Sequence, residues 1–293
     1  MINTSKIEED RSSGAFGIQL PEWLIQLLRH KLSVFGIVII MVACFAAVAA
    51  PVIVPHDPFA QDYDNTLMTP SFQHVLGTDY LGRDAFSRLI YGTRISLTVG
   101  LLSVVIAAVI GIPLGVLAAY FGGWTDHLIM RFIDAKMAIP GLMLSMLLLL
   151  VLGGGIMTVS FALGFGLSSA QARLIRSQAL SVKEREYFAA ARAMGVSHWK
   201  LMFIHMLPNS IQPVIVQASL GVGFAILGEA GLSFLGLGVS LPTPTWGNML
   251  TNAQNVIFER PMAAVWPGLF IFMTVISINF LGDGLRAKFD PTV

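Results

Sequence analysis

The chain is 293 residues long and strongly apolar, with 55% hydrophobic residues, 12% charged residues and a mean hydropathy of +0.73. Soluble globular proteins carry about 25% charged residues. The composition therefore argues against an ordinary soluble enzyme and predicts an integral membrane protein. A net charge of +1 gives no support for nucleic-acid binding. A single cysteine, Cys44, excludes an internal disulfide.

Six apolar segments are long enough to cross a membrane, because a bilayer core of about 30 Å needs roughly 20 apolar residues per helix. They are residues 33–54, 95–121, 137–154, 156–175, 211–236 and 263–281. Only Gly153-Gly154-Gly155 separates the third segment from the fourth, which predicts a tight hairpin. The pattern predicts an all-α polytopic membrane protein with six transmembrane helices.

The distribution of positive charge predicts the orientation of these helices. If the N-terminus lies inside, four of the 18 Lys and Arg residues fall in outer segments and the other 14 in inner segments. The four are Arg83, Arg88, Arg94 and Arg260. Because inner loops of membrane proteins are enriched in Lys and Arg, we expect both termini to be cytoplasmic.

The inner segment between the fourth and fifth spans has the pattern of two short helices. Residues Ser181 to Met194, "SVKEREYFAAARAM", favour a helix throughout, with no Pro or Gly. Gly195 suits the end of this helix, and Ser197 suits the N-cap of a second helix. We expect Pro208 to end the second helix.

Three interpretations of this segment compete. A DNA-binding helix-turn-helix needs a strongly cationic face, but residues 184–207 carry three cations and two acids, a net charge of +1. A solvated connecting helix is a second interpretation. In the third, small alanines let a cytoplasmic partner approach closely, and larger side chains fill a groove in that partner. The larger side chains are Tyr187, Phe188, Met194 and Trp199.

The segment resembles the cytoplasmic loop signature of bacterial ABC-importer permeases: Glu-Ala-Ala, three residues, Gly, nine residues, Ile, one residue, Leu-Pro. The matching residues are Ala190, Ala191, Gly195, Leu207 and Pro208. Two positions depart from the signature, since Ala189 replaces the acid and His205 replaces the Ile. Five further motifs lie in order along the chain, the first two before this segment and the other three after it: "HDP", "LGTDYLGRDAFSRLIYGTRISL", "GEAGLSFLGLG", "PTPTWGNML" and "LGDGLRAKFDP". Together they resemble the second permease subunit of dipeptide, oligopeptide or nickel importers.

This resemblance implies a type I ABC-importer permease fold and a place in the bacterial inner membrane. It implies a heterodimer with a homologous permease subunit, two cytoplasmic ABC ATPase subunits and an extracytoplasmic substrate-binding protein, with lipid around it and no nucleic acid. The chain itself would be non-catalytic and would form half of a pathway that imports peptides or a related small solute. ATP and Mg²⁺ would bind to the ATPase subunits, and this chain would bind no cofactor.

The resemblance also implies a docking helix for an ATPase. The residues that it assigns to docking are Glu186, Tyr187, Phe188, Ala189, Ala190, Ala191, Met194, Gly195, His198 and Trp199. The expected organisation is a cytoplasmic tail (1–32), a first transmembrane helix (33–54), a periplasmic scoop-like loop (55–93), a permease core (94–285) containing the coupling loop (176–208), and a cytoplasmic tail (286–293).

Two polar residues inside the predicted spans are candidates for the pathway or for a subunit interface. A carboxylate at mid-bilayer costs about 2.5–3.5 kcal/mol on insertion scales, so Glu229 is not expected to face lipid. It faces the pathway, or it is protonated, or it is paired at the interface with the partner permease. Asn279 lines the pore or bridges two helices. In the outer loop, we expect Arg83 and Asp84 to join an internal ion-pair network.

Enzyme chemistry has little support in the sequence. It contains no Gly-x-x-x-x-Gly-Lys-Ser/Thr, His-Glu-x-x-His or Gly-x-Ser-x-Gly motif. The six histidines are scattered, so no metal site is expected. An intramembrane hydrolase, the alternative among enzymes, needs a nucleophile and a base at mid-depth, and the spans offer none.

Overall fold

The structure is a computed structural model that describes residues 31–289. The predicted N-terminal tail lies almost wholly outside these residues, as does the end of the C-terminal tail. Five long helices run along the molecule: α3 (Lys31–Ile53), α4 (Ala85–Phe121), α7 (Ile156–Lys183), α11 (Gln212–Phe234) and α13 (Met262–Phe289). Within residues 31–289 the regular elements are all helical, which confirms the all-α prediction.

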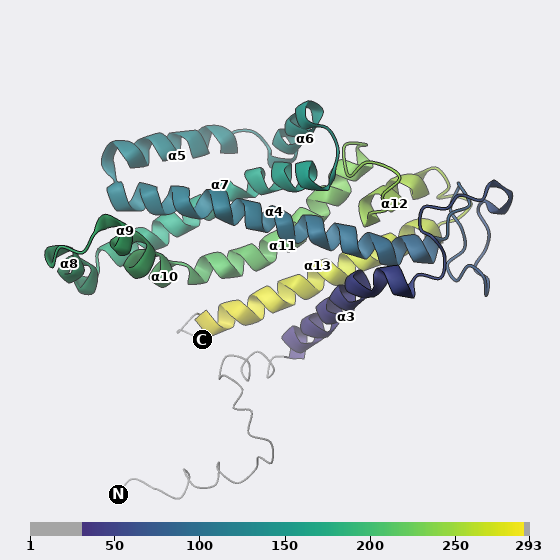
Figure 1. The fold of residues 1–293 in the computed structure, drawn as a ribbon, viewed down its shortest axis with the longest axis horizontal. Coiled ribbons are helices and arrows are strands. Elements are labelled where there is room, and N and C mark those ends of the chain that lie inside the picture. The colour runs from purple at the N-terminus through teal and green to yellow at the C-terminus, as the bar shows by residue number, and fades with distance from the viewer. Residues whose placement is uncertain (1–30, 290–293) are drawn as a thin grey trace, which may run out of the picture.

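The shorter helices connect these long ones and lie at the two ends of the bundle or along its side (Figure 1). They are α5 (Gly123–Met137), α6 (Gly141–Leu152), α8 (Glu186–Ala193), α9 (His198–Lys200), α10 (Leu207–Ser210) and α12 (Trp246–Gln254), with a 3₁₀ turn at Tyr63–Asn65 and a π-helical turn at Leu201–Met206.

Among the residues that the structure describes, four helices are long and apolar enough to cross a membrane, namely α3, α4, α11 and α13. A fifth span exists if α5 and α6, which meet at an angle of 88°, count as one. The predicted third span, residues 137–154, is therefore wrong as a single straight helix. Its apolar part, α6, has 12 residues and is only about 18 Å long. The helix breaks before Pro140, because a proline disfavours the helical conformation of the residue before it.

Residues 123–137, expected as a connecting segment, form α5, whose polar side chains attach it to α7. Asp126 pairs with Arg176, and Asp134 pairs with Arg173. The Lys136 ammonium group donates to the Phe165 carbonyl and the Ser168 hydroxyl, each at 2.6 Å. These partners explain why a helix with so many charges lies against the bundle. Helix α7 continues beyond the predicted end at residue 175, to Lys183, and Ala179 and Val182 of this extension are buried in an apolar cluster.

Glycines set the close packing of α4 against α7. An ideal Cβ on Gly111 would lie 2.5 Å from the Ser168 carbonyl oxygen, and one on Gly115 would lie 2.3 Å from the Ala172 carbonyl oxygen. Only glycine permits such an approach of two backbones, as at other small-residue contacts between membrane helices. Pro113 lies between these glycines without ending α4.

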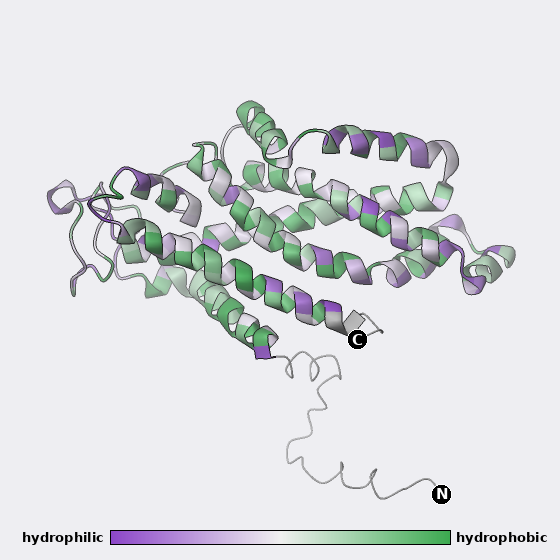
Figure 2. Ribbon diagram, turned by 180° about the vertical axis from the view of Figure 1, so that it is seen from behind, coloured by the Kyte–Doolittle hydropathy of each residue, from purple (hydrophilic) through white to green (hydrophobic). Residues whose placement is uncertain are grey.

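The two ends of the bundle are polar and its middle is apolar, as the hydropathy colours in Figure 2 show. One end carries residues 54–84, which we call the 54–84 loop; the other carries residues 184–211, which we call the 184–211 segment (Figure 1). The loop is shorter than the predicted 55–93, because α4 begins at Ala85. The Asp84 side chain accepts a hydrogen bond from the Ser87 backbone N–H at 2.7 Å and so caps this helix.

Candidate functional site

The 184–211 segment begins with a break in the helix that the sequence predicts to be continuous from Ser181 to Met194. Helix α7 ends at Lys183, Arg185 is extended with φ −76° and ψ 143°, and α8 begins at Glu186. The break turns α8 so that Phe188 and Ala191 pack into a buried cluster with side chains of α4 and α7. Burial of these side chains, which helix propensity does not register, explains the correction.

The ten predicted docking residues divide into two groups. Phe188 and Ala191 are only 2% and 5% exposed, so Phe188 holds α8 to the bundle and does not fill a groove in a partner. The other eight lie on the surface: Glu186, Tyr187, Ala189, Ala190, Met194, Gly195, His198 and Trp199. Met194 and Trp199 are 78% and 67% exposed, which is unusual for large apolar side chains.

Gly195 ends α8 as predicted. Its φ is +76°, in the left-handed region. The Gly195 N–H donates to the Arg192 carbonyl at 3.1 Å, and the Val196 N–H donates to the Ala191 carbonyl at 3.3 Å. This pair of bonds is the Schellman motif that closes many helices.

The second helix of the segment differs from the prediction in two ways. Ser197 occupies the N-cap position of α9, but its side chain makes no capping hydrogen bond. Pro208 does not end the helical run, because a π-helical turn at Leu201–Met206 precedes it. The Leu207 N–H bonds to the Met202 carbonyl, and Pro208 then lies in the first turn of α10, where a helix does not need its N–H.

Polar contacts join the ends of α7 and α4 and attach the 184–211 segment to α4. Lys183 Nζ donates to the carbonyls of Ala119 at 3.0 Å and Tyr120 at 2.8 Å, in the last turn of α4. The Tyr120 hydroxyl bonds to Nδ1 of His198. Helix α9 is therefore bonded to the end of α4, which is bonded in turn to the end of α7.

A hollow beside α8 combines positive charge with small side chains. It is lined by Lys183, Phe188, Ala189, Arg192 and Ala193. The small side chain of Ala189 leaves the hollow open, whereas an acidic side chain at this position would fill part of it. The hollow has the charge to receive an acidic side chain from another protein.

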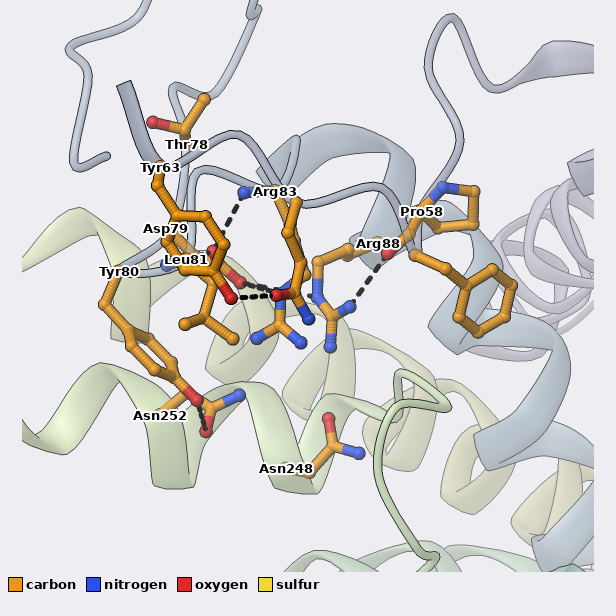
Figure 3. Close-up of polar contacts among 12 residues, drawn as sticks. Pro58, Tyr63, Thr78, Asp79, Tyr80, Leu81, Arg83, Arg88, Asn248 and Asn252 are labelled. Atoms are coloured by element: carbon orange, nitrogen blue, oxygen red, sulfur yellow. Dashed lines mark hydrogen bonds and ion pairs between the residues drawn. The ribbon is translucent and has the colours of Figure 1, made fainter. Parts of the chain in front are cut away.

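At the opposite end, Asp79 organises the 54–84 loop (Figure 3). Its carboxylate accepts from Arg83 Nε at 2.7 Å and from the backbone N–H groups of Leu81 and Arg83. Arg88 Nε lies 3.6 Å from the same carboxylate, and Arg88 also donates to the Pro58 carbonyl at 2.8 Å. Arg83 and Arg88 are 2% and 1% exposed. The predicted ion-pair role of Arg83 is thus confirmed.

This network stands over α12 and borders a cavity of about 200 Å³ at the end of the bundle. Mostly apolar side chains line the cavity, among them Met249 and Trp266, with Tyr80 and Asn252 at its wall. The Tyr80 hydroxyl donates to Asn252 at 3.4 Å, which links the loop to α12. The predicted outer loop is consequently a packed cover over one end of the helices.

The two candidates for the pathway lie within the bundle. Glu229 is 0% exposed and accepts from the Ser233 hydroxyl at 2.7 Å. Glu229 is thus enclosed within this chain, and its predicted roles, facing the pathway, protonated, or paired at the interface with the partner permease, stay predictions. Asn279 is half-buried, and its Oδ1 lies 4.0 Å from where a Cβ of Gly223 would be. The Asn279 side chain therefore lies on α13 beside α11, and its two predicted roles, lining the pore or bridging helices, stay predictions.

One cluster of metal-ligating side chains was missed by the sequence reasoning. His56, His74 and Asp84 each place one ligand atom within 4.8 Å of the others. The spacings of 18 and 10 residues match no metal-binding motif, so only the fold of the 54–84 loop brings these side chains together.

Comparison with family models gives two matches. Residues 111–293 match the model for a binding-protein-dependent transport system inner membrane component. Residues 20–70 match the model for the N-terminal transmembrane domain of oligopeptide transport permease C.

Curated relatives and solved structures agree with these matches. The chain is 40% identical to the dipeptide transport system permease protein DppC of Alkalihalophilus pseudofirmus, over 91% of this chain and 88% of that protein. It is also 40% identical to the glutathione transport system permease protein GsiD of Pectobacterium atrosepticum, over 99% and 96%. A structure of the MetNI methionine ABC transporter matches the fold with a TM-score of 0.56 at 19% identity, over 68% of this chain and 95% of that one.

The chain is accordingly a multi-pass inner membrane permease subunit of an ABC transporter, and ATPase subunits and a binding protein are its partners. It is not itself the catalytic subunit. More than half of the chain matches one family model, and the curated relatives match nearly all of it. The chain therefore belongs to the family of binding-protein-dependent transport system inner membrane components.

Proposed function

We propose that the chain imports peptides or a related small solute, and that it pairs with a homologous permease subunit to form the pathway. The names of its relatives, which transport dipeptides or glutathione, support this solute class. In this arrangement two ATPases lie on the cytoplasmic side, where they bind ATP and Mg²⁺, and a binding protein delivers the solute on the other side.

The proposal includes six spans with both termini in the cytoplasm of a bacterium. The four long apolar helices and the bent pair α5–α6 account for up to five crossings. The proposal assigns the sixth to α7, which has 28 residues but is not among those apolar helices. The 14 inner cations favour the orientation that puts the 184–211 segment in the cytoplasm and the 54–84 loop outside.

The coupling role is supported by the two faces of α8, because one face is buried against the bundle and the other is exposed. Its buried side chains fix it to α4 and α7, while Ala189, Ala190, Met194 and Trp199 stay on the surface. Surface alanines let a partner helix or groove approach closely, and exposed Met and Trp supply contact area. Movement of an ATPase would displace α8 as a rigid body and shift the long helices, which opens one end of the pathway as the other closes.

The test uses Ala190→Trp, which adds a large side chain to the exposed face of α8. We expect the purified permease complex to lose ATPase subunits and solute uptake, while its thermal stability stays unchanged. The matched control is Gln73→Trp, also on an exposed position but in the 54–84 loop, which should keep the ATPases. Full ATPase stoichiometry with Ala190→Trp would show that α8 is only a connector.

A further inference from the structure

Three side chains that can ligate a metal converge where the 54–84 loop meets the start of α4. Nδ1 of His74 lies 2.9 Å from Oδ1 of Asp84, and Nδ1 of His56 lies 3.9 Å from the same oxygen. The two imidazole rings face each other with centroids 4.7 Å apart and planes tilted by 30°. The residues come from three separate stretches of the loop, so their convergence depends on its fold.

Each of the three residues makes a hydrogen bond to a nearby serine. Oδ2 of Asp84 accepts from the Ser87 backbone N–H at 2.7 Å, which leaves Oδ1 directed toward the histidines. The His56 backbone N–H donates to the Ser87 hydroxyl at 3.2 Å, and the His74 backbone N–H donates to the Ser71 hydroxyl at 3.1 Å. The bond to Asp84 orients a ligand side chain, as outer contacts do in established metal sites, and the two backbone bonds fix the parts of the loop that carry the histidines.

Charge also favours a cation here. The Asp84 side chain is 1% exposed, and the arginines nearest to it in sequence, Arg83 and Arg88, direct their Nε atoms to Asp79 instead. The N-terminus of α4 offsets only part of the Asp84 charge. Buried carboxylates are normally paired with a full cation or coordinate a metal.

The geometry suits a first-row transition metal. Zinc binds nitrogen and carboxylate oxygen at about 2.0–2.2 Å, so two ligands of a tetrahedral site lie about 3.4 Å apart. The observed distances of 2.9 and 3.9 Å fall on either side of this value and need only small side-chain rotations. Two imidazoles and one carboxylate match the donors of zinc and similar ions, whereas calcium and magnesium prefer sites made of oxygens.

We propose that His56, His74 and Asp84 form a binding site for a divalent transition metal, which fastens the 54–84 loop to the start of α4. The side chain of His56 is 41% exposed, so the ion is reached from solvent and keeps an open position for water or another ligand. Loss of the ion weakens this attachment without releasing the loop, because Arg88 still donates to the Pro58 carbonyl and the His56 N–H to the Ser87 hydroxyl.

The test measures zinc in the full transporter complex, purified in detergent, stripped with a chelator and then equilibrated with Zn²⁺ alone. We expect wild type to hold one more zinc ion per chain than His56→Ala or His74→Ala, and to bind it at least about tenfold more tightly. His127→Ala is the matched control, because that exposed histidine on α5 bonds to the Gly123 carbonyl, outside the cluster. It should retain the wild-type zinc content.

A second readout uses Co²⁺ in place of zinc. Visible absorption of bound cobalt should appear in wild type and His127→Ala and disappear in His56→Ala, whose exposed position makes misfolding a poor explanation for the loss. Equal zinc contents in wild type and both cluster variants would overturn the proposal. So would the absence of zinc from wild type, which would leave the contact between His74 and Asp84 as an ordinary hydrogen bond.

Discussion

The ammonium group of Lys183 donates a hydrogen bond of 2.8 Å to the backbone carbonyl of Tyr120 and thereby joins the end of α7 to the end of α4. A cation at this position satisfies carbonyls that the last turn of a helix leaves without partners, and it interacts favourably with the helix dipole. Tyr120 in turn bonds to His198 of α9. The contact between Lys183 and Tyr120 therefore joins α7 to α4 directly before the 184–211 segment begins.

Replacing Lys183 by Met should weaken this junction. Loss of charged hydrogen bonds to the carbonyls of Ala119 and Tyr120 should cost about 1–3 kcal/mol of stability. We expect lower thermal stability in detergent and a smaller stimulation of ATPase activity by the loaded binding protein. Lys183→Arg, which keeps the charge and the donors, should restore most of both. Identical behaviour of the Met and Arg variants would argue against the junction.

Gly195→Val should impair docking without unfolding the spans. No atom lies within 4 Å of an added Cβ, so the cost comes from the φ of +76° and not from a clash. That strain is worth about 1–3 kcal/mol. The expected result is a lower ratio of ATPase to permease after purification and lower uptake in vesicles. Gly195→Asn is the control, because Asn tolerates the left-handed region better than a β-branched residue does. A Val variant with full uptake would contradict the role of the turn.

Ala189→Glu should be tolerated, whereas Ala191→Glu should not. Position 189 is exposed and borders a hollow that Lys183 and Arg192 also line, so a carboxylate there gains about 0.2–0.5 kcal/mol from Arg192, three residues on. Ala191 is 5% exposed, and a carboxylate there would be buried in an apolar cluster. The measurement is complex yield and ATPase content for both variants. Equal losses of complex yield and ATPase content in the two variants would show that α8 does not bury the face that carries Ala191.

Asp79→Asn should destabilise the 54–84 loop. Asp79 is the carboxylate that both Arg83 and Arg88 contact, and both arginines are buried. Removing one partner of a buried ion pair costs about 3–5 kcal/mol. We expect faster proteolysis of the loop and a lower melting temperature. Asp64→Asn, at an exposed position of the same loop, is the control and should match wild type. Unchanged proteolysis of the Asp79 variant would refute the organising role of this residue.

The proposed orientation is tested with single cysteines in a Cys44→Ser background. Phe72→Cys and Phe258→Cys replace fully exposed side chains at the end that carries the 54–84 loop. They should react with a membrane-impermeant maleimide in intact cells. Trp199→Cys, on the 184–211 segment, should react only after the membrane is opened. Labelling of Trp199→Cys in intact cells would reverse the orientation and with it the docking role of α8.

The sequence alone determined the features that depend on local or compositional signals. Apolar length predicted α3, α11 and the start of α13 within a few residues, because a membrane requires long apolar helices whatever their neighbours. Helix α13 continues to Phe289, beyond the predicted end at residue 281. Gly195 was identified as the end of α8, since a left-handed residue after a helix strongly favours glycine. The motifs around Ala190, Gly195 and Pro208 identified the family, because they combine residue types at fixed spacings.

Tertiary structure decided the features that depend on contacts between distant residues. The break before Glu186 and the burial of Phe188 follow from packing against α4 and α7, a gain that helix propensity does not include. Helix α5 exists beside α7 because Asp126 and Lys136 find partners about 30 to 50 residues further along the chain. His56, His74 and Asp84 meet only because the loop folds back on α4, since an extended chain would separate residues 18 positions apart by tens of ångströms.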